Sequence, residues 1–449
     1  MPESEKNVDS DEAFAYTYLA GSDPDVLQRM QQIPANFPIT NSHFQSIPQL
    51  AGDDLSQAMR EGRVYYVDYA IMKDLENGSH PQQPKYMFAP IAAFALPRGG
   101  GPLLPFAIQT GQNPQGRTIY TPMDKWSWKI ARSTVQAATN AHSAIISHLS
   151  LTHIVMEPVA LCLYRNLSPK HPVYALLQPH IENTLIINNS AFKTLVGPNQ
   201  FVDRMLGSTI DSNYDLIRST RRDFDFKAQY LPNKLSRNKT LDNTTLSLYP
   251  YRDDGLLLWN EIYRWVSKYL SYYYPTEKDL AMDLEIQAWA FEIGSDTMGQ
   301  VRGFASGSGV GSIQELIETV TMIIFTAGPQ HAAVNFAQKS DMAYVPSAPM
   351  AGYTPELSGK NHSELDWLKF LPPLDVAVVQ LTLCYMLGSV YYGRLGDYGS
   401  IFSNSPVESF LKDYQRNLKE IESTIETRNK TRRSYLHLMP SRIPQSINI

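Results

Sequence analysis

The sequence predicts a mainly α-helical protein with small β elements near its N-terminus. The first observation is a segment from Asp124 to Leu167 that contains no glycine and no proline before Pro158. The second is a series of later segments with apolar residues at helical spacing. The third is a pair of short apolar runs before residue 100 that read as strands. Together they favour a helical fold with one small sheet.

The bulk composition indicates a large buried core or an apolar cavity. The chain has 449 residues, of which 43% are hydrophobic and 18% charged, against about 25% charged in ordinary globular proteins. The net charge of −5 does not suggest nucleic acid as a partner, nor strong electrostatic attraction to a membrane. Both cysteines, Cys162 and Cys384, lie in apolar segments and are expected to be packed thiols. The acidic first 14 residues do not resemble a secretory signal, so we expect a cytoplasmic protein.

The N-terminal third is predicted to be mixed in structure. Asp, Ser and Pro residues recur through residues 1–40 and disfavour regular structure, so this part is predicted to be a loosely ordered lead-in. The runs "VYYVDYAIM" (64–72) and "KYMFAPIAAFAL" (85–96) read as strands. Residues 97–116 are rich in Gly and Pro, which predicts a loop.

From Asp124 the pattern predicts one long amphipathic helix of about 35 to 40 residues. Its apolar positions recur three to five residues apart, at Trp126, Ile130, Val135, Ala138, Ala141, Ile145 and Leu149.

Helical signals resume later in the chain, with polar segments between them. We expect helices near residues 173–196, 255–273, 276–293, 313–338, 374–393 and 404–425, and a loop over 218–255. Residues 377–393 barely reach membrane-spanning length and include Gln380 and Thr382, so a buried core helix is the preferred interpretation. The basic tract "RNKTRR" (428–433) is expected to be solvated surface.

Four polar residues stand out within apolar helical segments: His148, His153, His331 and Asn335. A lone histidine in such a place is usually a core residue with its hydrogen bonds satisfied, but three of them suggest a shared site. His331 and Asn335 are four residues apart and lie on one helix face. His148 and His153 are five apart, which in a regular helix separates them by about 140°. They can converge only if the helix widens, so the spacing predicts a π-bulge near residues 148–153.

Several separated motifs resemble the lipoxygenase family in order and spacing. "SHLSLTH" is followed by "EP", "RNLS", "HP" and "LLQPH", and "HAAVNF" resembles the second iron motif of that family. "GRVYYVDYAIMKDL" resembles a strand near the substrate entrance, and "YLHLMPSRIPQSINI" resembles the family's C-terminus. The resemblance spans about residue 35 to the end. It implies a lipoxygenase-like catalytic domain built around a long central helix.

The resemblance implies one non-haem iron per chain, held by His148, His153, His331, Asn335 and the terminal carboxylate of Ile449. Three imidazoles with amide and carboxylate oxygens form a mixed N/O ligand set suited to iron. In the family, iron-bound hydroxide takes hydrogen from the bis-allylic methylene of a cis,cis-1,4-pentadiene. O2 then adds to give a hydroperoxide. We therefore expect linoleate or linolenate as substrate, with C9 among the candidate positions, and no further catalytic side chain.

The resemblance also assigns roles to residues around the iron. Ala191 falls where the family carries Ala or Gly, a position linked to S or R products, although the rule has exceptions. Leu195 and Val202 would line the substrate and oxygen channel; the alternative is that they are plain core residues. Gln338 resembles a glutamine that hydrogen-bonds near the Asn ligand, and the alternative is an ordinary polar helix end.

The expected organisation is a lead-in over residues 1–40 and a catalytic domain over 41–449, without a separate N-terminal β-barrel lipid-binding domain. We expect a monomer whose partners are a polyunsaturated fatty acid and O2. Any peripheral membrane contact would use exposed apolar faces in the first 100 residues. Two alternatives stay open: a fatty acid hydroperoxide isomerase on the same scaffold, and a metal-free fatty-acid-binding protein. A zinc hydrolase is disfavoured because the sequence has no HExxH motif.

Overall fold

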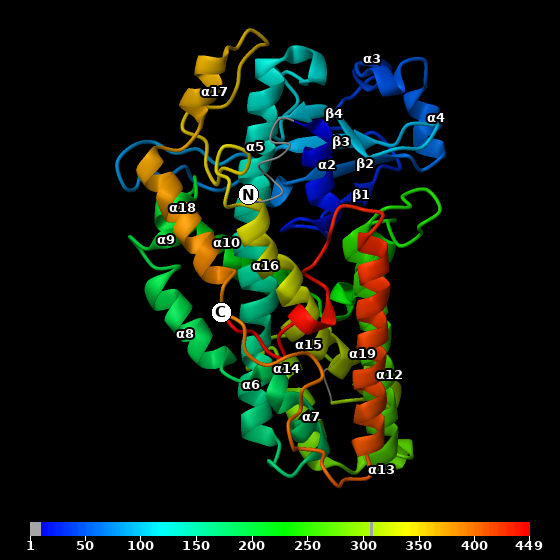
Figure 1. Ribbon diagram of the computed structural model, residues 1–449. Coiled ribbons are helices and arrows are strands. Elements are labelled where there is room, and N and C mark those ends of the chain that lie inside the picture. Colours follow the sequence, from blue (N-terminus) through cyan, green and yellow to red (C-terminus); the bar gives the residue numbers. More distant parts are fainter. Residues whose placement is uncertain (1–9, 306–308) are drawn as a thin grey trace.

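A long central helix organises the fold of the computed structural model, which describes residues 10–305 and 309–449. Helix α5 (Trp126–His142), a π-helical segment (Ser143–Ile154) and α6 (Val155–Asn166) form one continuous helix of 41 residues. Figure 1 shows it running down the middle of the molecule. Among the described residues it is the only single helix long and apolar enough to cross a membrane. Since 72% of its most apolar window is buried inside the protein, it is a core helix here.

The π-helical segment confirms the sequence prediction for residues 148–153. It contains both His148 and His153, and it extends further in each direction than their spacing required.

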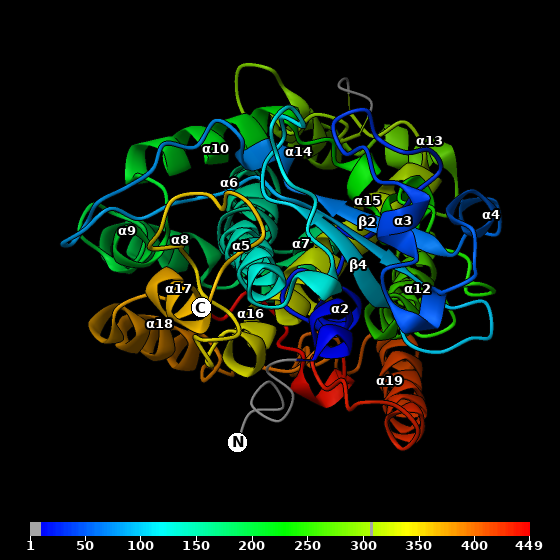
Figure 2. The ribbon, with the colours of Figure 1, turned by 90° about the horizontal axis from the view of Figure 1, so that it is seen from above.

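Helices surround this axis on most sides (Figure 2). Those before residue 250 are α2 (Asp11–Ala20), α3 (Asn41–Phe44), α4 (Leu55–Arg60), α7 (Pro172–Ile181), α8 (Thr184–Thr194), α9 (Phe201–Met205), α10 (Ile210–Asp223) and α11 (Leu231–Arg237). The later ones are α12 (Pro250–Tyr273), α13 (Glu277–Ala281), α14 (Leu284–Gly294), α15 (Ile313–Phe325), α16 (His331–Asp341), α17 (Glu364–Phe370), α18 (Leu374–Leu387) and α19 (Glu408–Asn429). A second π-helical segment, Thr326–Gln330, joins α15 to α16. The single helix expected over 313–338 is thus interrupted directly before His331.

The small sheet is antiparallel, with strand order β1-β2-β3-β4. Its strands are β1 (Gln28–Arg29), β2 (Val64–Asp68), β3 (Ile91–Ala95) and β4 (Leu104–Gln109). Neighbouring residues of β2 point to opposite faces: Tyr65 and Val67 join the main core, whereas Val64 joins a smaller core on the other face. The predicted strands over 64–72 and 85–96 are confirmed in part. The prediction of a loop over residues 97–116 was wrong, because strand β4 lies within this range and pairs with β3.

The prediction that residues 1–40 are loosely ordered was wrong in the part that the structure describes. Residues 11–20 form α2, which is N-capped by Ser10 and buries Phe14, Tyr18 and Leu19 in the main core. Its first turn is fixed by Asp11, which accepts hydrogen bonds from Trp128 and Arg132 of α5. A short apolar face within a polar sequence was enough to order this segment.

Three other expectations need correction. The loop over 218–255 includes the end of α10, all of α11 and the start of α12. The helix expected over 374–393 ends at Leu387, and only one of its faces is buried. The basic tract 428–433 is not simply solvated, since the side chain of Arg432 is buried and pairs with the buried Asp254. Both cysteines are free and buried, as predicted.

Candidate metal centre

Three buried histidines converge at the centre of the molecule. One ligand nitrogen from each of His148, His153 and His331 lies within 4.8 Å of the other two. The Nε2 atom of His148 is 3.2 Å from Nε2 of His331 and 3.2 Å from Nε2 of His153. No other group of three or more His, Cys, Asp or Glu side chains with such geometry occurs in the described ranges. The structure therefore brings together the three histidines that the sequence singled out.

Burial keeps these imidazoles neutral. Desolvation lowers the pKa of His153 to about 4, against the opposing effects of hydrogen bonds to Asn188 and Ile449. Desolvation, followed by repulsion from the neighbouring histidines, holds the pKa of His148 and of His331 well below the ordinary value. A neutral imidazole has a free lone pair on one nitrogen, which is the form that binds a metal ion.

A hydrogen bond to Asn188 of α8 determines which nitrogen of His153 faces the cluster. Nδ1 of His153 lies 3.0 Å from Oδ1 of Asn188 and donates to it, which leaves the Nε2 lone pair directed at the cluster. The Asn188 amide is oriented in turn, because Nδ2 donates to the carbonyl of His153 and to the Glu157 carboxylate, both at 3.0 Å. Sequence reasoning missed Asn188. The signal was available, since "INNS" is polar within an apolar helical segment, but only the fold shows which asparagine is buried.

Asn335 and Ile449 add oxygen atoms beside the histidines. Nδ2 of Asn335 donates to the carbonyl of Leu387 at 3.0 Å, and its buried Oδ1 has no hydrogen-bond partner in the described structure. A buried acceptor without a partner is costly, which fits an atom that coordinates a cation. An oxygen of Ile449 lies 3.3 Å from Nε2 of His331. The donor set therefore fits a metal ion with mixed N/O ligation.

Gln338 lies beside His148 in this structure. Its amide nitrogen is 3.4 Å from Nδ1 of His148, and the side chain is buried. With a metal on Nε2 of His148, the proton sits on Nδ1, and the amide orientation that presents oxygen to it would accept that hydrogen bond. Gln338, which the sequence placed near Asn335, thus contacts a histidine of the central helix.

A buried polar strap, residues 21–25, ties the two π-helical segments to the rest of the fold. Asp23 accepts hydrogen bonds from Ser147 at 2.6 Å and from Nδ1 of His142 at 2.8 Å. Asp25 accepts from Gln330 at 3.5 Å and pairs with Lys234. Ser147 directly precedes His148, and Gln330 directly precedes His331. The strap therefore contacts the chain next to two of the three histidines, which the sequence did not predict.

The expected channel residues follow Asn188 along the chain. Ala191 is on α8, three residues after Asn188 and so close to the same helix face. Leu195 caps α8, and Val202 lies in α9 and donates its backbone hydrogen bond to the Leu195 carbonyl at 3.0 Å. Leu195 is partly buried and Val202 is buried in the main core. These positions are compatible with both a channel role and a packing role.

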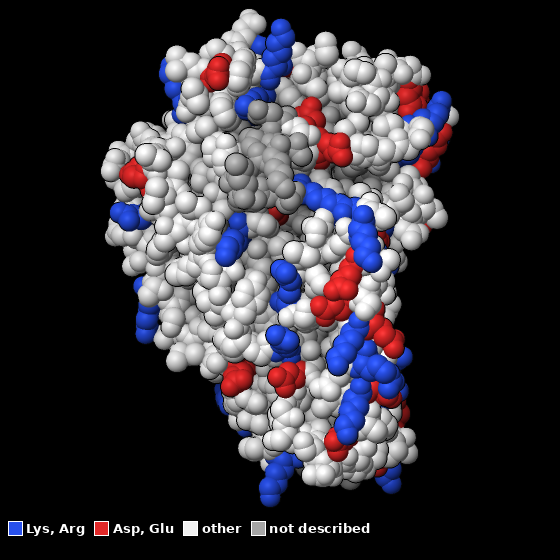
Figure 3. Space-filling view, viewed as in Figure 1, with Lys and Arg blue, Asp and Glu red and all other residues white. Residues whose placement is uncertain are grey.

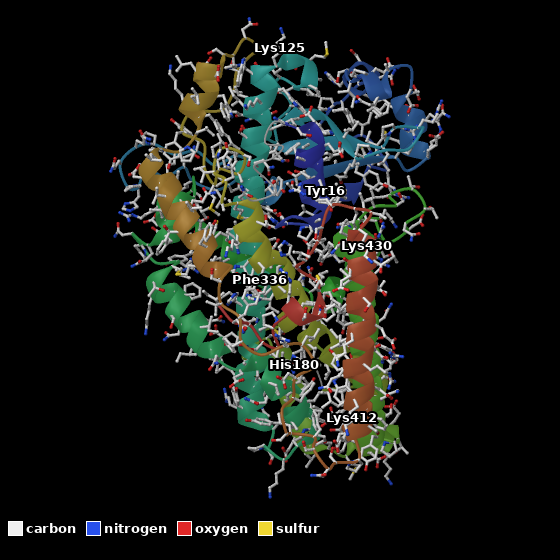
Figure 4. All side chains as sticks on the ribbon, viewed as in Figure 1. Tyr16, Lys125, His180, Phe336, Lys412 and Lys430 are labelled. Atoms are coloured by element: carbon white, nitrogen blue, oxygen red, sulfur yellow. The ribbon has the colours of Figure 1, made fainter. Side chains whose placement is uncertain are left out.

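The cluster is surrounded by parts of the chain that lie far apart in sequence. Figure 4 labels Phe336 on α16, the residue after Asn335, and His180 on α7. The C-terminal segment, red in Figure 1, passes into the interior toward them. The fold and the site together define a helical protein with a buried histidine centre that could hold a metal ion.

Comparisons with known proteins identify the family. A model of the lipoxygenase family matches residues 1–445. The chain is 40% identical to a linoleate 9/13-lipoxygenase of Pseudomonas aeruginosa, covering 100% of this chain and 68% of that protein. It is 30% identical to the human polyunsaturated fatty acid lipoxygenase ALOX15B, covering 98% of this chain and 65% of the relative. The chain thus spans about two thirds of the length of these relatives.

Solved structures agree with the sequence comparisons. A lipoxygenase determined anaerobically in complex with arachidonate superposes with a TM-score of 0.94 at 28% identity, covering 100% of this chain and 68% of that one. A coral 8R-lipoxygenase gives a TM-score of 0.92 at 29% identity, with the same coverage. The chain belongs to the lipoxygenase family, a family of dioxygenases.

Proposed function

We propose that this protein is a non-haem iron dioxygenase that inserts O2 into polyunsaturated fatty acids such as linoleate and linolenate. The observation that carries the proposal is the convergence of His148, His153 and His331 beside two oxygen atoms. The unpartnered Oδ1 of Asn335 and the oxygen of Ile449 complete a donor set of the kind that iron prefers. The name of the Pseudomonas relative and the arachidonate complex support the substrate class.

The residues of the chain would hold one iron and shape the space around it. His148, His153, His331, Asn335 and the carboxylate of Ile449 would bind it, with Asn188 and Gln338 fixing the ring protons of two histidines. Bound there, iron would supply one-electron redox chemistry. The buried setting would keep water from the substrate radical and leave O2 as its partner.

Position and stereochemistry of oxygen insertion depend on residues beside the reacting carbons. Ala191, Leu195 and Val202 are the candidates on α8 and α9. A methyl group at Ala191 would restrict the approach of O2 to one end of the pentadiene, and C9 remains a candidate for the oxygenated carbon. Replacing Ala191 with Gly should change the ratio of products measured by chiral chromatography.

The test combines metal content with turnover. The purified protein should contain one iron per chain, consume O2 with linoleate and form a conjugated diene that absorbs in the near ultraviolet. His331→Ala should lose both iron and activity, whereas His362→Ala should keep both, because His362 lies outside the cluster and bonds Ser127. Residues appended after Ile449 should lower the iron content, since they remove the terminal carboxylate. An iron-free protein that binds linoleate without O2 uptake would contradict the proposal.

A hydroperoxide isomerase is the second candidate. The human hydroperoxide isomerase ALOXE3 is 29% identical to this chain, over 98% of this chain and 62% of ALOXE3. In that case linoleate would not drive O2 uptake, while a fatty acid hydroperoxide would be consumed without O2. The same preparation therefore separates the two activities.

A further inference from the structure

Helix α18 has apolar residues on both of its faces. Its buried face consists of Val376, Gln380, Leu383, Cys384 and Leu387. The opposite face, which we call the α18 stripe, consists of Leu374, Val378, Leu381 and Tyr385, exposed by 80%, 52%, 39% and 47%. The spacing of four, three and four residues aligns them along the helix. The preceding helix α17 adds the exposed Leu365 and Leu368.

A groove opens at the C-terminal end of the stripe. It has a volume of about 520 Å³, and Tyr385 belongs to both the stripe and the groove. The rings of Phe336 and Tyr391 stack at 4.3 Å in its wall, and Nζ of Lys339 lies 4.8 Å from the ring centre of Tyr385. Arg442 completes the rim. We call this hollow the Tyr385 groove.

The groove carries positive charge without a matching carboxylate. No acidic residue lines the groove, and among the described residues neither Lys339 nor Arg442 forms an ion pair; Nζ of Lys339 lies 3.5 Å from the Ser389 hydroxyl. Figure 3 shows the wider setting: charged side chains gather over α19 on the right, whereas the face over α18 and α8 on the left is mostly uncharged. An apolar stripe that ends in tyrosines and cations is complementary to the interface of an anionic bilayer.

We propose that the α18 stripe and the Tyr385 groove dock this protein on the surface of an anionic phospholipid bilayer. The stripe would lie among the outer acyl segments, and Lys339 and Arg442 would contact the phosphate of a lipid headgroup. Docking here would place the bilayer next to α16, the helix that carries His331 and Asn335. This position differs from the first 100 residues, where the sequence placed membrane contact. The proposal extends the proposed oxygenation of acyl chains, but docking itself requires neither iron nor turnover.

Vesicle co-sedimentation of the full chain tests the proposal. Phosphatidylcholine vesicles that contain phosphatidylglycerol should bind the protein more tightly than vesicles of phosphatidylcholine alone. The double variant Lys339→Gln/Arg442→Gln should lose about 30-fold in affinity for the anionic vesicles, since each cation near such a surface contributes about fivefold. The double variant Val378→Glu/Leu381→Glu should lose binding to both kinds of vesicle, because it places two charges on the stripe.

Matched controls separate docking from general surface effects. Met282→Glu adds a carboxylate at a residue that is 70% exposed at the end of α13, and Lys419→Gln/Lys430→Gln removes two cations from α19 and its end, where Figure 4 labels Lys430. Both should bind vesicles as the wild type does, with unchanged thermal unfolding in all variants.

Three results would overturn the proposal. The first is equal binding to neutral and anionic vesicles, and the second is wild-type binding by both groove and stripe variants. The third is a wild-type dimer in light scattering that Val378→Glu/Leu381→Glu converts to monomer, which would show that a second copy covers the stripe. If the groove and stripe variants lose vesicle binding but still take up O2 with dispersed linoleate, the result would support docking. Absence of O2 uptake with vesicle binding retained would reject only the proposed function.

Discussion

At His153, one hydrogen bond decides which ring nitrogen faces the cluster. Asn188 accepts the Nδ1 proton at 3.0 Å, and its own amide is held by the His153 carbonyl and by Glu157. This arrangement fixes both the tautomer and the rotation of the ring before any metal binds. The adjacent Asn189 is exposed and makes no such contact with His153, so two neighbouring asparagines differ completely in role.

We expect Asn188→Leu to reduce metal affinity by about 10- to 100-fold, because His153 loses the partner that orients its ring. The measurement is iron content per chain after dialysis against a graded series of chelator concentrations. Asn189→Leu is the matched control and should behave as the wild type does. If Asn188→Leu retains iron as tightly as the control, Asn188 does not position the ring.

Arg432 shows how a basic residue can belong to the core. It contacts Asp254, whose side chain is fully buried, and Arg428 contacts the same carboxylate at 2.7 Å. Burial raises the pKa of Asp254, against the lowering effect of both arginines. Removing one arginine therefore leaves the buried carboxylate of Asp254 with only one positive charge to stabilise it.

We expect Arg432→Ala to destabilise the fold by about 3 kcal/mol, the order of magnitude found when one partner of a buried pair is removed. Arg416→Ala should change stability by less than about 1 kcal/mol, since Arg416 is exposed and its partner Asp413 is partly exposed. Urea unfolding of the two variants compares the effects directly. Equal midpoints would show that Asp254 does not depend on Arg432.

Among the elements, the strap 21–25 links the N-terminal part of the chain to both π-helical segments. Ser143 donates to the Ser22 carbonyl at 2.7 Å, and Ser147 donates to Asp23. A π-helical segment is rare and occurs mostly as a short widening of an α-helix, often at a functional site. Hydrogen bonds from outside the helix, close to the histidines, are the kind of support that it requires.

We expect Asp23→Ala to destabilise the protein by about 1–3 kcal/mol, because His142 and Ser147 lose their buried acceptor. Iron content should fall as well, since Ser147 adjoins His148. Asp74→Ala removes an exposed carboxylate and serves as the control. Retention of both stability and iron in Asp23→Ala would show that the strap does not hold the π segment.

The elements differ in how far the sequence could predict them. The central helix and its π segment were predictable, because the i, i+5 spacing of His148 and His153 can serve one site only on a widened helix. Strand β4 was not, because "LPFAIQ" lies among Gly and Pro residues and becomes a strand only by pairing with β3. The exposed face of α18 was hidden for another reason. Its sequence is apolar all round, and composition does not show which side faces the core.

Across the whole molecule, the site depends on chain segments that meet only in the folded state. The C-terminal segment is tied down at Gln445 and at Asn448, close to Ile449. Asn448 exchanges two hydrogen bonds with the backbone of Tyr392, at 3.1 and 3.0 Å. His180 of α7 donates from Nδ1 to the Gln445 carbonyl at 2.7 Å, and Tyr398 contacts its Nε2 at 2.8 Å. The oxygen of Ile449 beside His331 thus depends on contacts with distant parts of the fold.

His180 also links this anchoring to pH. Desolvation lowers its pKa in the folded state to about 4, from about 6.5 in the unfolded chain, and the hydrogen bond to Gln445 only partly opposes this. Above pH 6.5 neither state binds the proton, so the contribution of His180 to stability is fully present. Below pH 6.5 the unfolded chain takes up the proton first, and stability is lost as the pH falls toward 4. The loss amounts to at most about 3 kcal/mol for this one group.

We expect His180→Leu to have two effects that identify the anchor. At pH 7 it should lower stability and iron content together, although His180 is not itself in the histidine cluster, because the C-terminal segment loses its tie to α7. Between pH 6.5 and 4 its stability should fall less steeply than that of the wild type, since the titrating group is gone. Urea unfolding at several pH values, with iron measured on the same samples, gives both results, and His362→Leu controls for loss of a histidine elsewhere. A variant with a wild-type pH slope and full iron content would mean that Ile449 is held in place without His180.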